Sequence, residues 1–185
     1  TELTACDNSL YNKLVQHSRS VVSKLSKGVA YLMQKNNITV IDGTASLAEK
    51  CLLDVMQEGK VTQYKAKHII LATGARARNL PGIEIDGDLV WGASEAMTPA
   101  IMPKNLLVIG AGAIGVEFAS LYNDLGTNVT LVEAEKRITP AEDSEISQIA
   151  EKSFKKRGIK VLTNNLVQSV ERAGAETVAH IIGPD

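Results

Sequence analysis

The sequence contains little that would support cysteine, metal or nucleic-acid chemistry. Its two cysteines, Cys6 and Cys51, form no CxxC or CxxxxC pair, which leaves one long-range disulfide open and favours a reduced, intracellular chain. The three histidines are scattered without ligand spacing, so no metal site is predicted. Twenty basic residues against 21 acidic ones leave a net charge of -1, and this lack of a basic surplus argues against a nucleic-acid partner.

Long apolar runs are also absent. None approaches the ~18–20 residues that a membrane span needs. The first residues, TELTACDNSLYNK, show neither a signal-peptide pattern nor an Arg-rich amphipathic one. Apolar residues nevertheless make up 44% of the 185-residue chain, which is typical of a globular protein with one core or two small lobes.

The first third of the sequence predicts a long helix. Apolar residues recur at three- and four-residue spacing from Tyr11 to about Gln34. Asp7 or Ser9 is a candidate cap for the start of this helix, and Asn36-Asn37 ends it.

A small β-meander and one buried strand are predicted next. The meander reads ITVIDGTASL, with Gly43 as a bulge or turn, then KCLLDVM and VTQYKA. QEGK, between the last two segments, predicts a four-residue hairpin loop with a glycine where a positive φ is needed. The apolar run from His68 to Ala72, ended by Gly74, predicts a strand buried on both faces of a parallel sheet.

The second half of the sequence predicts strands that alternate with helices, the pattern of an α/β fold. It follows a crossover from Arg76 to Lys104 that contains a short predicted helix at Ala93–Met97. The predicted elements are the strand Leu106–Ile109, the helix Ala113–Leu125, the strand Val129–Val132, the helix Asp143–Arg157, the strand IKVL, and a hairpin formed by LVQSVERA and TVAHII.

Three glycines stand between the first strand of this half and its first helix. Gly110, Gly112 and Gly115 form a G-x-G-x-x-G motif in the context that a dinucleotide requires. Gly110 allows a tight turn, Gly112 allows a pyrophosphate to approach the backbone, and Gly115 allows close helix–sheet packing. The free N–H groups at the start of the helix would hold the anion.

An acidic residue ends the next strand, as this kind of site requires. Glu133 lies 18 residues after Gly115, close to the usual ~20, where a carboxylate can accept hydrogen bonds from both ribose hydroxyls. It would repel a 2′-phosphate, so the motif favours NAD over NADP, although the nearby Arg137 weakens that preference. Glu117, early in the same helix, is either a solvated acid or a polar contact to the nicotinamide end.

Together these segments resemble a known family. HIILATGA after a meander, then ATGARARNLPG, then VIGAGAIGVEFASLYNDLGTNVTLVE are similar to the flavoprotein disulfide reductases with two dinucleotide-binding domains, most of all to the dihydrolipoyl dehydrogenases. The resemblance covers nearly the whole chain and is most specific from His68 to Glu133. It implies a Rossmann-like NAD-binding domain, partial here, together with part of a second, FAD-binding-type domain that contains the meander.

The resemblance also implies roles for individual residues. It implies that Gly43 contacts the adenosine end of FAD. It also implies that the segment Thr73, Gly74, Ala75 runs beside this cofactor. Arg76 and Arg78 are either cations near cofactor phosphates or, as we favour, solvated loop charges. The NAD site that it implies is lined by Gly110, Ala111, Gly112, Ala113, Ile114, Gly115, Glu117, Glu133 and Val167.

The resemblance further predicts which parts of such an enzyme this sequence lacks. No earlier glycine-rich motif, redox disulfide or acid–base histidine pair is present, so no catalytic residue is assigned and the chain alone is expected not to turn over. The expected division is residues 1–82 as a partial FAD-binding domain, 83–104 as crossover and 105–185 as a truncated NAD-binding domain, an interior piece of a longer parent.

The resemblance implies NAD and FAD as cofactors, the lipoyl group of a 2-oxo-acid dehydrogenase complex as partner, a homodimeric parent, and a bacterial cytoplasm or a mitochondrial matrix as location. Glutathione- and mercuric-type reductases are rivals within this class, but most of them prefer NADP, against which Glu133 argues. A stand-alone NAD-binding or scaffold module without catalytic activity remains the alternative.

Overall fold

The computed structural model describes residues 8–184 and divides the chain into two compact units. Unit 1 contains the residues up to His17 and those from Ala77 onward, and unit 2 contains Ser18–Arg76. Cys6 and Asp7, the candidate disulfide partner and helix cap, lie outside the described residues, as does the side chain of Ser9. Among the described residues no helix is long and apolar enough to cross a membrane.

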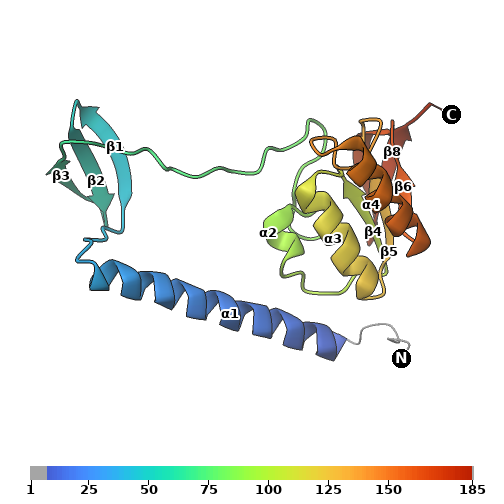
Figure 1. Cartoon of the computed structure of the whole chain (residues 1–185), viewed down its shortest axis with the longest axis horizontal. Coiled ribbons are helices and arrows are strands. Elements are labelled where there is room, and N and C mark those ends of the chain that lie inside the picture. Colours follow the sequence, from blue (N-terminus) through green and yellow to red (C-terminus); the bar gives the residue numbers. More distant parts are fainter. Residues whose placement is uncertain (1–7, 185) are drawn as a thin grey trace. The chain divides into compact units, whose positions relative to one another are not determined.

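The long helix and the meander are confirmed. Helix α1 spans Asn8–Lys35, and Asn37 ends it in the left-handed conformation with φ 54°. The strands β1 (Thr44–Glu49), β2 (Leu52–Gln57) and β3 (Lys60–Lys65) form an antiparallel sheet in sequential order (Figure 1). The apolar stripe of α1 that predicted the helix is buried at Tyr11, which is 5% exposed, but is largely exposed farther along, with Leu25 at 66% and Val29 at 57%.

Two details of the meander differ from expectation. Gln57 pairs with Lys60, so the hairpin loop contains two residues, Glu58 and Gly59, both at positive φ, rather than four. Gly43 is neither the bulge nor a positive-φ turn, because the register shift falls between Leu47 and Glu49.

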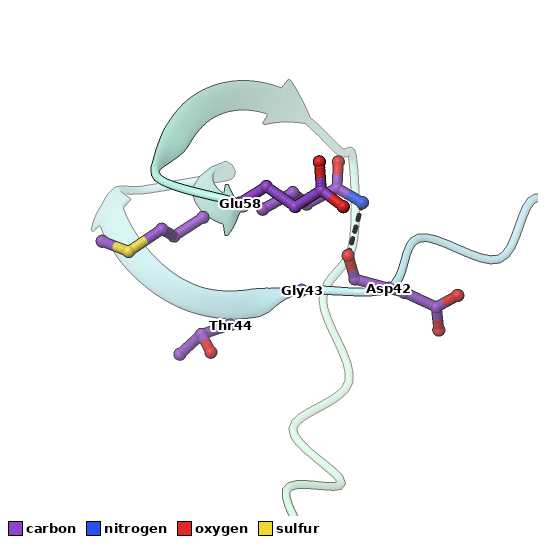
Figure 2. A pocket seen from close by; sticks show the side chains of 6 residues that line it. Asp42, Gly43, Thr44 and Glu58 are labelled. Atoms are coloured by element: carbon purple, nitrogen blue, oxygen red, sulfur yellow. Dashed lines mark hydrogen bonds between the residues drawn. The ribbon is translucent and has the colours of Figure 1, made fainter.

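Gly43 is instead a point of close backbone approach. A Cβ there would lie 2.7 Å from the carbonyl oxygen of Met56, so only glycine fits beside β2 (Figure 2). The side-chain amide of Gln57 donates to the carbonyl of Asp42 next to it, which closes the start of β1 against the end of β2.

The prediction of a buried strand at His68–Ala72 is wrong for this structure. The segment forms no strand, and Ile70 is 91% and Leu71 68% exposed. A strand needs at least one neighbouring strand to pair with, and no described strand pairs with this segment. Its apolar run therefore remains extended and uncovered.

Unit 1 is built around the predicted parallel sheet. Strands β4 (Asn105–Ile109), β5 (Asn128–Val132) and β6 (Lys160–Leu162) lie in that order, and β4 and β6 each have one side without a partner among the described strands. Helix α3 (Ala113–Asp124) connects β4 to β5, and α4 (Ser144–Lys156) connects β5 to β6. This is the strand–helix–strand alternation that the sequence predicts, and it confirms the α/β class.

The two faces of this sheet have different covers. Val129 and Leu131 of β5 belong to a core with Ala119 and Tyr122 of α3 and with Phe154 of α4. Val132 points to the other face, with Val167 of β7 (Leu166–Ala173), which pairs with β8 (Glu176–Ile182) in an antiparallel hairpin. Alternation along β5 thus buries one set of side chains under the helices and the other under the hairpin.

The helix ends follow the expected chemistry. The Asp143 side chain caps α4 by accepting the N–H of Glu145 at 2.8 Å, and Gly158 follows its end with φ 88°. The short predicted helix is α2 (Ala93–Ala96), whose last carbonyl accepts the Tyr122 hydroxyl at 2.6 Å. Burial raises the pKa of Tyr122, so this hydroxyl stays protonated as a donor.

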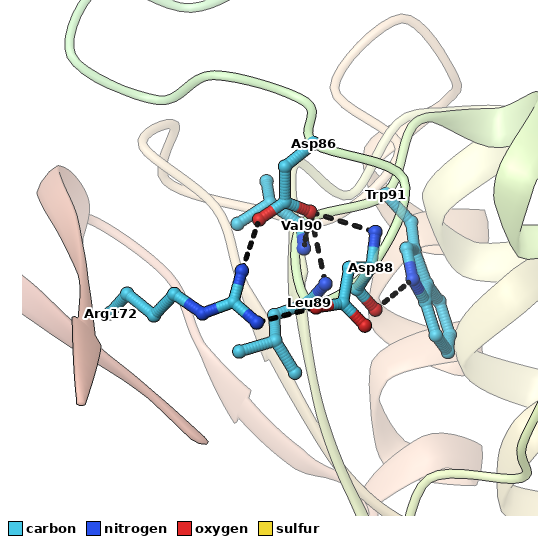
Figure 3. Close-up of polar contacts among 6 residues, drawn as sticks. All are labelled: Asp86, Asp88, Leu89, Val90, Trp91 and Arg172. Carbon is cyan, nitrogen blue, oxygen red and sulfur yellow. Dashed lines mark hydrogen bonds and ion pairs between the residues drawn. The ribbon is translucent and has the colours of Figure 1, made fainter. Parts of the chain in front are cut away.

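Within unit 1, ion pairs join the crossover segment, through Asp86 and Asp88, to the β7–β8 hairpin (Figure 3). One carboxylate oxygen of Asp86 accepts the backbone N–H groups of Asp88, Leu89 and Val90 at 2.8–2.9 Å. Arg172 of β7 lies 3.6 Å from Asp86 and also contacts the carboxylate of Asp88. The N–H of Val90, followed by the other backbone donors and Arg172, lowers the pKa of Asp86 below its usual 3.8.

This contact predicts a response to acid. Because the pKa of folded Asp86 lies below its unfolded value, its charged form stabilises the loop above pH ~4 and is lost as the pH falls through the lower value. We expect Trp91 emission, a reporter because its indole N–H donates to the carbonyl of Asp88 at 2.7 Å, to stay constant from pH 7 to about 4 and to change below that. Asp86→Asn should show at pH 7 the Trp91 emission that the wild-type chain reaches only in acid. A wild-type transition in this emission centred above pH 5 would contradict a role for Asp86.

Candidate functional site

The glycine-rich turn leads from β4 directly into α3. Gly110 follows the last residue of β4 with φ 95°, a conformation that disfavours any residue with a Cβ, and its N–H donates to the carbonyl of Val132 at 2.8 Å. Gly112 is the N-cap of α3 and supplies no side chain to its free N–H groups. These groups therefore point to a place where an external anion can accept their hydrogen bonds.

The three glycines differ in what they contribute to the turn. A Cβ on Gly115 would lie 1.9 Å from the carbonyl oxygen of Gly110, so the first turn of α3 could not lie against the loop. A Cβ on Gly110 or Gly112 would meet no atom within 4 Å. The space beside Gly112 is open and its φ of −70° would accept any residue, so the protein itself does not require glycine there and the space is free for an external group. The turn fits a bound pyrophosphate.

Glu133 lies at the mouth of this turn, as the sequence predicts. Glu133 is 8% exposed, and one of its carboxylate oxygens accepts the N–H of Ala111, the residue between the first two glycines, at 2.6 Å. The other oxygen accepts the N–H of Glu135 at 2.9 Å. Each carboxylate oxygen offers about two lone-pair sites, so the capacity to accept a ribose hydroxyl remains at each oxygen.

The loop after Glu133 is held by hydrogen bonds from the Arg137 side chain to backbone carbonyls of the same loop. Arg137 donates from Nη2 to the carbonyls of Pro140 at 3.0 Å and Glu142 at 3.3 Å. Its buried Nε has no hydrogen-bond partner among the described residues. This guanidinium is therefore bound within its loop, and the negative charge next to the turn comes from Glu133.

The remaining predicted NAD residues lie around the same turn or close to it. Ala113, Ile114 and Glu117 are exposed on the first turns of α3, with Ile114 62% exposed. Val167 is 8% exposed and packs with Val132, the residue just before Glu133. The predicted NAD residues thus come from the turn after β4, from α3, from the position just after β5, and from β7.

The residues assigned to FAD by resemblance are not brought together in the same way. Gly43 borders an open hollow of about 530 Å³ lined by Asp42, Thr44, Met56, Gln57 and Glu58 (Figure 2). Thr73, Gly74 and Ala75 are exposed in an extended segment, with Gly74 at φ 78°, and Arg76 and Arg78 are exposed as well. Among the described residues no hydrogen bond joins this segment to the hollow at Gly43.

One part of the site had no sequence signal. Thr139 donates its N–H to the carbonyl of Ala111 at 2.7 Å, and the fully buried Ser147 of α4 contacts Thr139. Neither residue belongs to a motif. Only the interruption of the apolar pattern of α4 by a buried serine could have drawn attention to it.

Comparison with known proteins places this geometry in a family. The sequence-family model of the pyridine nucleotide-disulphide oxidoreductases matches residues 4–183 of this chain. The chain belongs to this family. The dihydrolipoyl dehydrogenase of Rhizobium etli is 44% identical over 183 residues, and that of Zymomonas mobilis is 44% identical over 175. These alignments cover 91% and 94% of the chain but 38% of each relative, so the chain spans well under half the length of the curated relatives it matches.

A solved structure agrees with this family membership. LpdA from Mycobacterium tuberculosis superposes with a TM-score of 0.85 at 25% identity, over 91% of this chain and 38% of that one. The resemblance that the sequence analysis drew from its motifs is thus confirmed at the level of the family and of the fold.

Proposed function

We propose that this chain carries the NAD-binding half-site of a dihydrolipoyl dehydrogenase. The observation that carries the proposal is the contact between Glu133 and Ala111, which joins a ribose-recognising carboxylate to the phosphate-binding turn. The division into a partial FAD-binding domain at 1–82, a crossover at 83–104 and an NAD-binding domain at 105–185 is part of the proposal.

The proposed reaction is the oxidation of dihydrolipoamide through a disulfide and FAD to NAD. When bound, the flavin would carry electrons between the disulfide and the nicotinamide. This chain's contribution would be binding and orientation: the N–H groups at the start of α3 hold the pyrophosphate, and Glu133 selects an unphosphorylated ribose. Val167 would pack against the adenine, and the first turns of α3, up to Glu117, would extend toward the nicotinamide end.

The flavin side of the proposal is supported by fewer contacts. Gly43 and the segment Thr73–Ala75 would form one wall of the FAD site, and the open hollow at Gly43 would accept the adenosine end. The lipoyl group of a 2-oxo-acid dehydrogenase complex as substrate, a homodimeric whole protein, and a bacterial cytoplasm or mitochondrial matrix as location come from the similarity to relatives of this name.

The proposal can be tested with a chimera. The segment of the Rhizobium etli enzyme that aligns with this chain is replaced by the chain itself. We expect the purified chimera to retain FAD and to form NADH from dihydrolipoamide at no less than about a tenth of the parent rate, an allowance of ~1.4 kcal/mol in the barrier for imperfect interfaces.

A second chimera with Gly112→Ala is the matched control and should retain flavin but lose NADH formation. A folded, flavin-containing first chimera that binds no NAD would contradict the proposed function. Retention of flavin and NAD binding with no dihydrolipoamide oxidation would instead favour the alternative of an NAD-binding module without this activity.

A further inference from the structure

Thr139 has an unusual backbone conformation next to the proposed NAD site. Its φ is 45°, in the left-handed region, where a β-branched residue is a genuine outlier. Such conformations persist only when surrounding contacts hold them.

Ser147 of α4 supplies the side-chain contacts that hold Thr139, whose carbonyl also accepts the backbone N–H of Glu142 at 2.9 Å. Ser147 is 0% exposed, and its Oγ lies 3.2 Å from the carbonyl oxygen of Thr139 and 3.1 Å from the Thr139 hydroxyl. The same Oγ lies 3.0 Å from the carbonyl oxygen of Asp143. A serine hydroxyl has one proton, so it donates to one of these carbonyls while accepting from the hydroxyl of Thr139. In the orientation that donates to Thr139, both the carbonyl and the hydroxyl of Thr139 are bonded to Ser147.

The conformation of Thr139 directs its N–H at the glycine-rich turn. This N–H donates to the carbonyl of Ala111 at 2.7 Å, while the N–H of Ala111 donates to Glu133 at 2.6 Å. Ala111 is thus hydrogen-bonded through both its N–H and its carbonyl, and it stands between Gly110 and Gly112 in the turn. If Thr139 relaxed to negative φ, its N–H would turn away and the turn would lose the hydrogen bond that fixes the carbonyl of Ala111.

We propose that Ser147 and Thr139 are positioning residues that hold the glycine-rich turn in register with Glu133 for the adenosine half of the coenzyme. This inference rests on the proposed NAD site and extends it to residues that touch no coenzyme. The buried hydroxyl of Ser147 holds Thr139 at positive φ, Thr139 holds the carbonyl of Ala111, and Ala111 presents its N–H to Glu133.

The test measures the dissociation constants of NADH and of ADP-ribose for the 185-residue chain and its variants, by calorimetry. Ser147→Ala removes the hydroxyl and should raise both constants by about the same factor, roughly tenfold, because about 1.4 kcal/mol corresponds to one decade and the loss falls on the adenosine half. Ser153→Ala removes an exposed hydroxyl on the same helix that makes no hydrogen bond within residues 8–184, and should change neither constant.

A rescue variant separates positioning from a general loss of structure. Glycine adopts positive φ without steric cost, so Thr139→Gly added to Ser147→Ala should recover part of the lost affinity. A cavity or an unsatisfied group left by Ser147→Ala would not be repaired by that change. If Ser147→Ala does not fold, Thr139→Val, which removes only the Thr139 hydroxyl, should raise both constants about threefold.

The outcomes distinguish this inference from the function on which it rests. If the wild-type chain binds neither NADH nor ADP-ribose, the NAD site is wrong and the inference falls with it. If wild type binds and Ser147→Ala (or Thr139→Val in its place) binds equally well, only the positioning role is overturned. A loss with Ser147→Ala that Thr139→Gly does not reduce also overturns it.

Discussion

A Gly112→Ala variant is expected to fold as stably as the wild-type chain and to bind NADH about a hundredfold more weakly. The added Cβ meets no protein atom within 4 Å, and the φ of −70° suits alanine, so the substitution should not lower the stability of the protein. The methyl group would instead occupy the space through which a pyrophosphate reaches the N–H groups of α3. Forcing an extra methyl group into a filled site costs about 1–3 kcal/mol, which is roughly fivefold to 150-fold in affinity, and the expected loss lies toward the upper end of this range.

Two other glycines provide matched controls for this experiment. Gly115→Ala would place its Cβ 1.9 Å from the carbonyl oxygen of Gly110, so it should lower both thermal stability and NADH affinity. Gly28→Ala, inside α1 with nothing within 4 Å of the new Cβ, should raise helix stability by about 1 kcal/mol and leave binding unchanged. Undiminished NADH affinity in Gly112→Ala, measured by calorimetry beside thermal unfolding, would show that no phosphate passes this turn.

Glu133→Ala is expected to lower NADH affinity by about a hundredfold and to abolish the preference for NADH over NADPH. The substitution removes an acceptor of ribose hydroxyls and leaves the N–H of Ala111 without its 2.6 Å partner. A hydrogen bond to a charged group contributes about 1.5–3 kcal/mol, and the unpaired N–H adds its own penalty. Loss of the negative charge also removes the repulsion of a 2′-phosphate, so NADPH should lose much less affinity than NADH.

Glu135→Ala is the control for this substitution, since Glu135 is exposed and contributes only its backbone N–H to Glu133. Parallel titrations with NADH and NADPH give the ratio that matters. A wild-type chain that binds both equally, or a Glu133→Ala variant that keeps the wild-type ratio, would remove the carboxylate from the recognition of the ribose.

The NAD lobe could be predicted from sequence because its signals are local. The β4–α3 turn, the acid at the end of β5 and the cap of α4 each arise from residues a few positions apart, whose chemistry depends little on the rest of the fold. The spatial link between Glu133 and Ala111 also followed from topology, because neighbouring parallel strands bring their carboxyl ends to one edge.

The errors came from residues whose conformation depends on distant partners. The apolar run at His68–Ala72 has the composition of a buried strand, but composition cannot supply the neighbouring strands that would pair with it. Gly43 could be understood only once β2 was known to pass 2.7 Å from its missing Cβ. Likewise, Thr139 and Ser147 act through a contact between the loop after β5 and a helix, which no spacing rule encodes.

The open edges of the parallel sheet affect how the isolated chain will behave in solution. The outer sides of β4 and β6 present backbone donors and acceptors that no described strand satisfies. Such edges are templates for pairing with another chain, and charged side chains on an edge strand oppose that pairing. β6 begins with the charged Lys160, whereas β4, with the sequence Asn-Leu-Leu-Val-Ile, contains no charged residue. Self-association through β4 should therefore set the upper limit on usable protein concentration, and a lysine placed on that strand's solvent side is the first change to try for solubility.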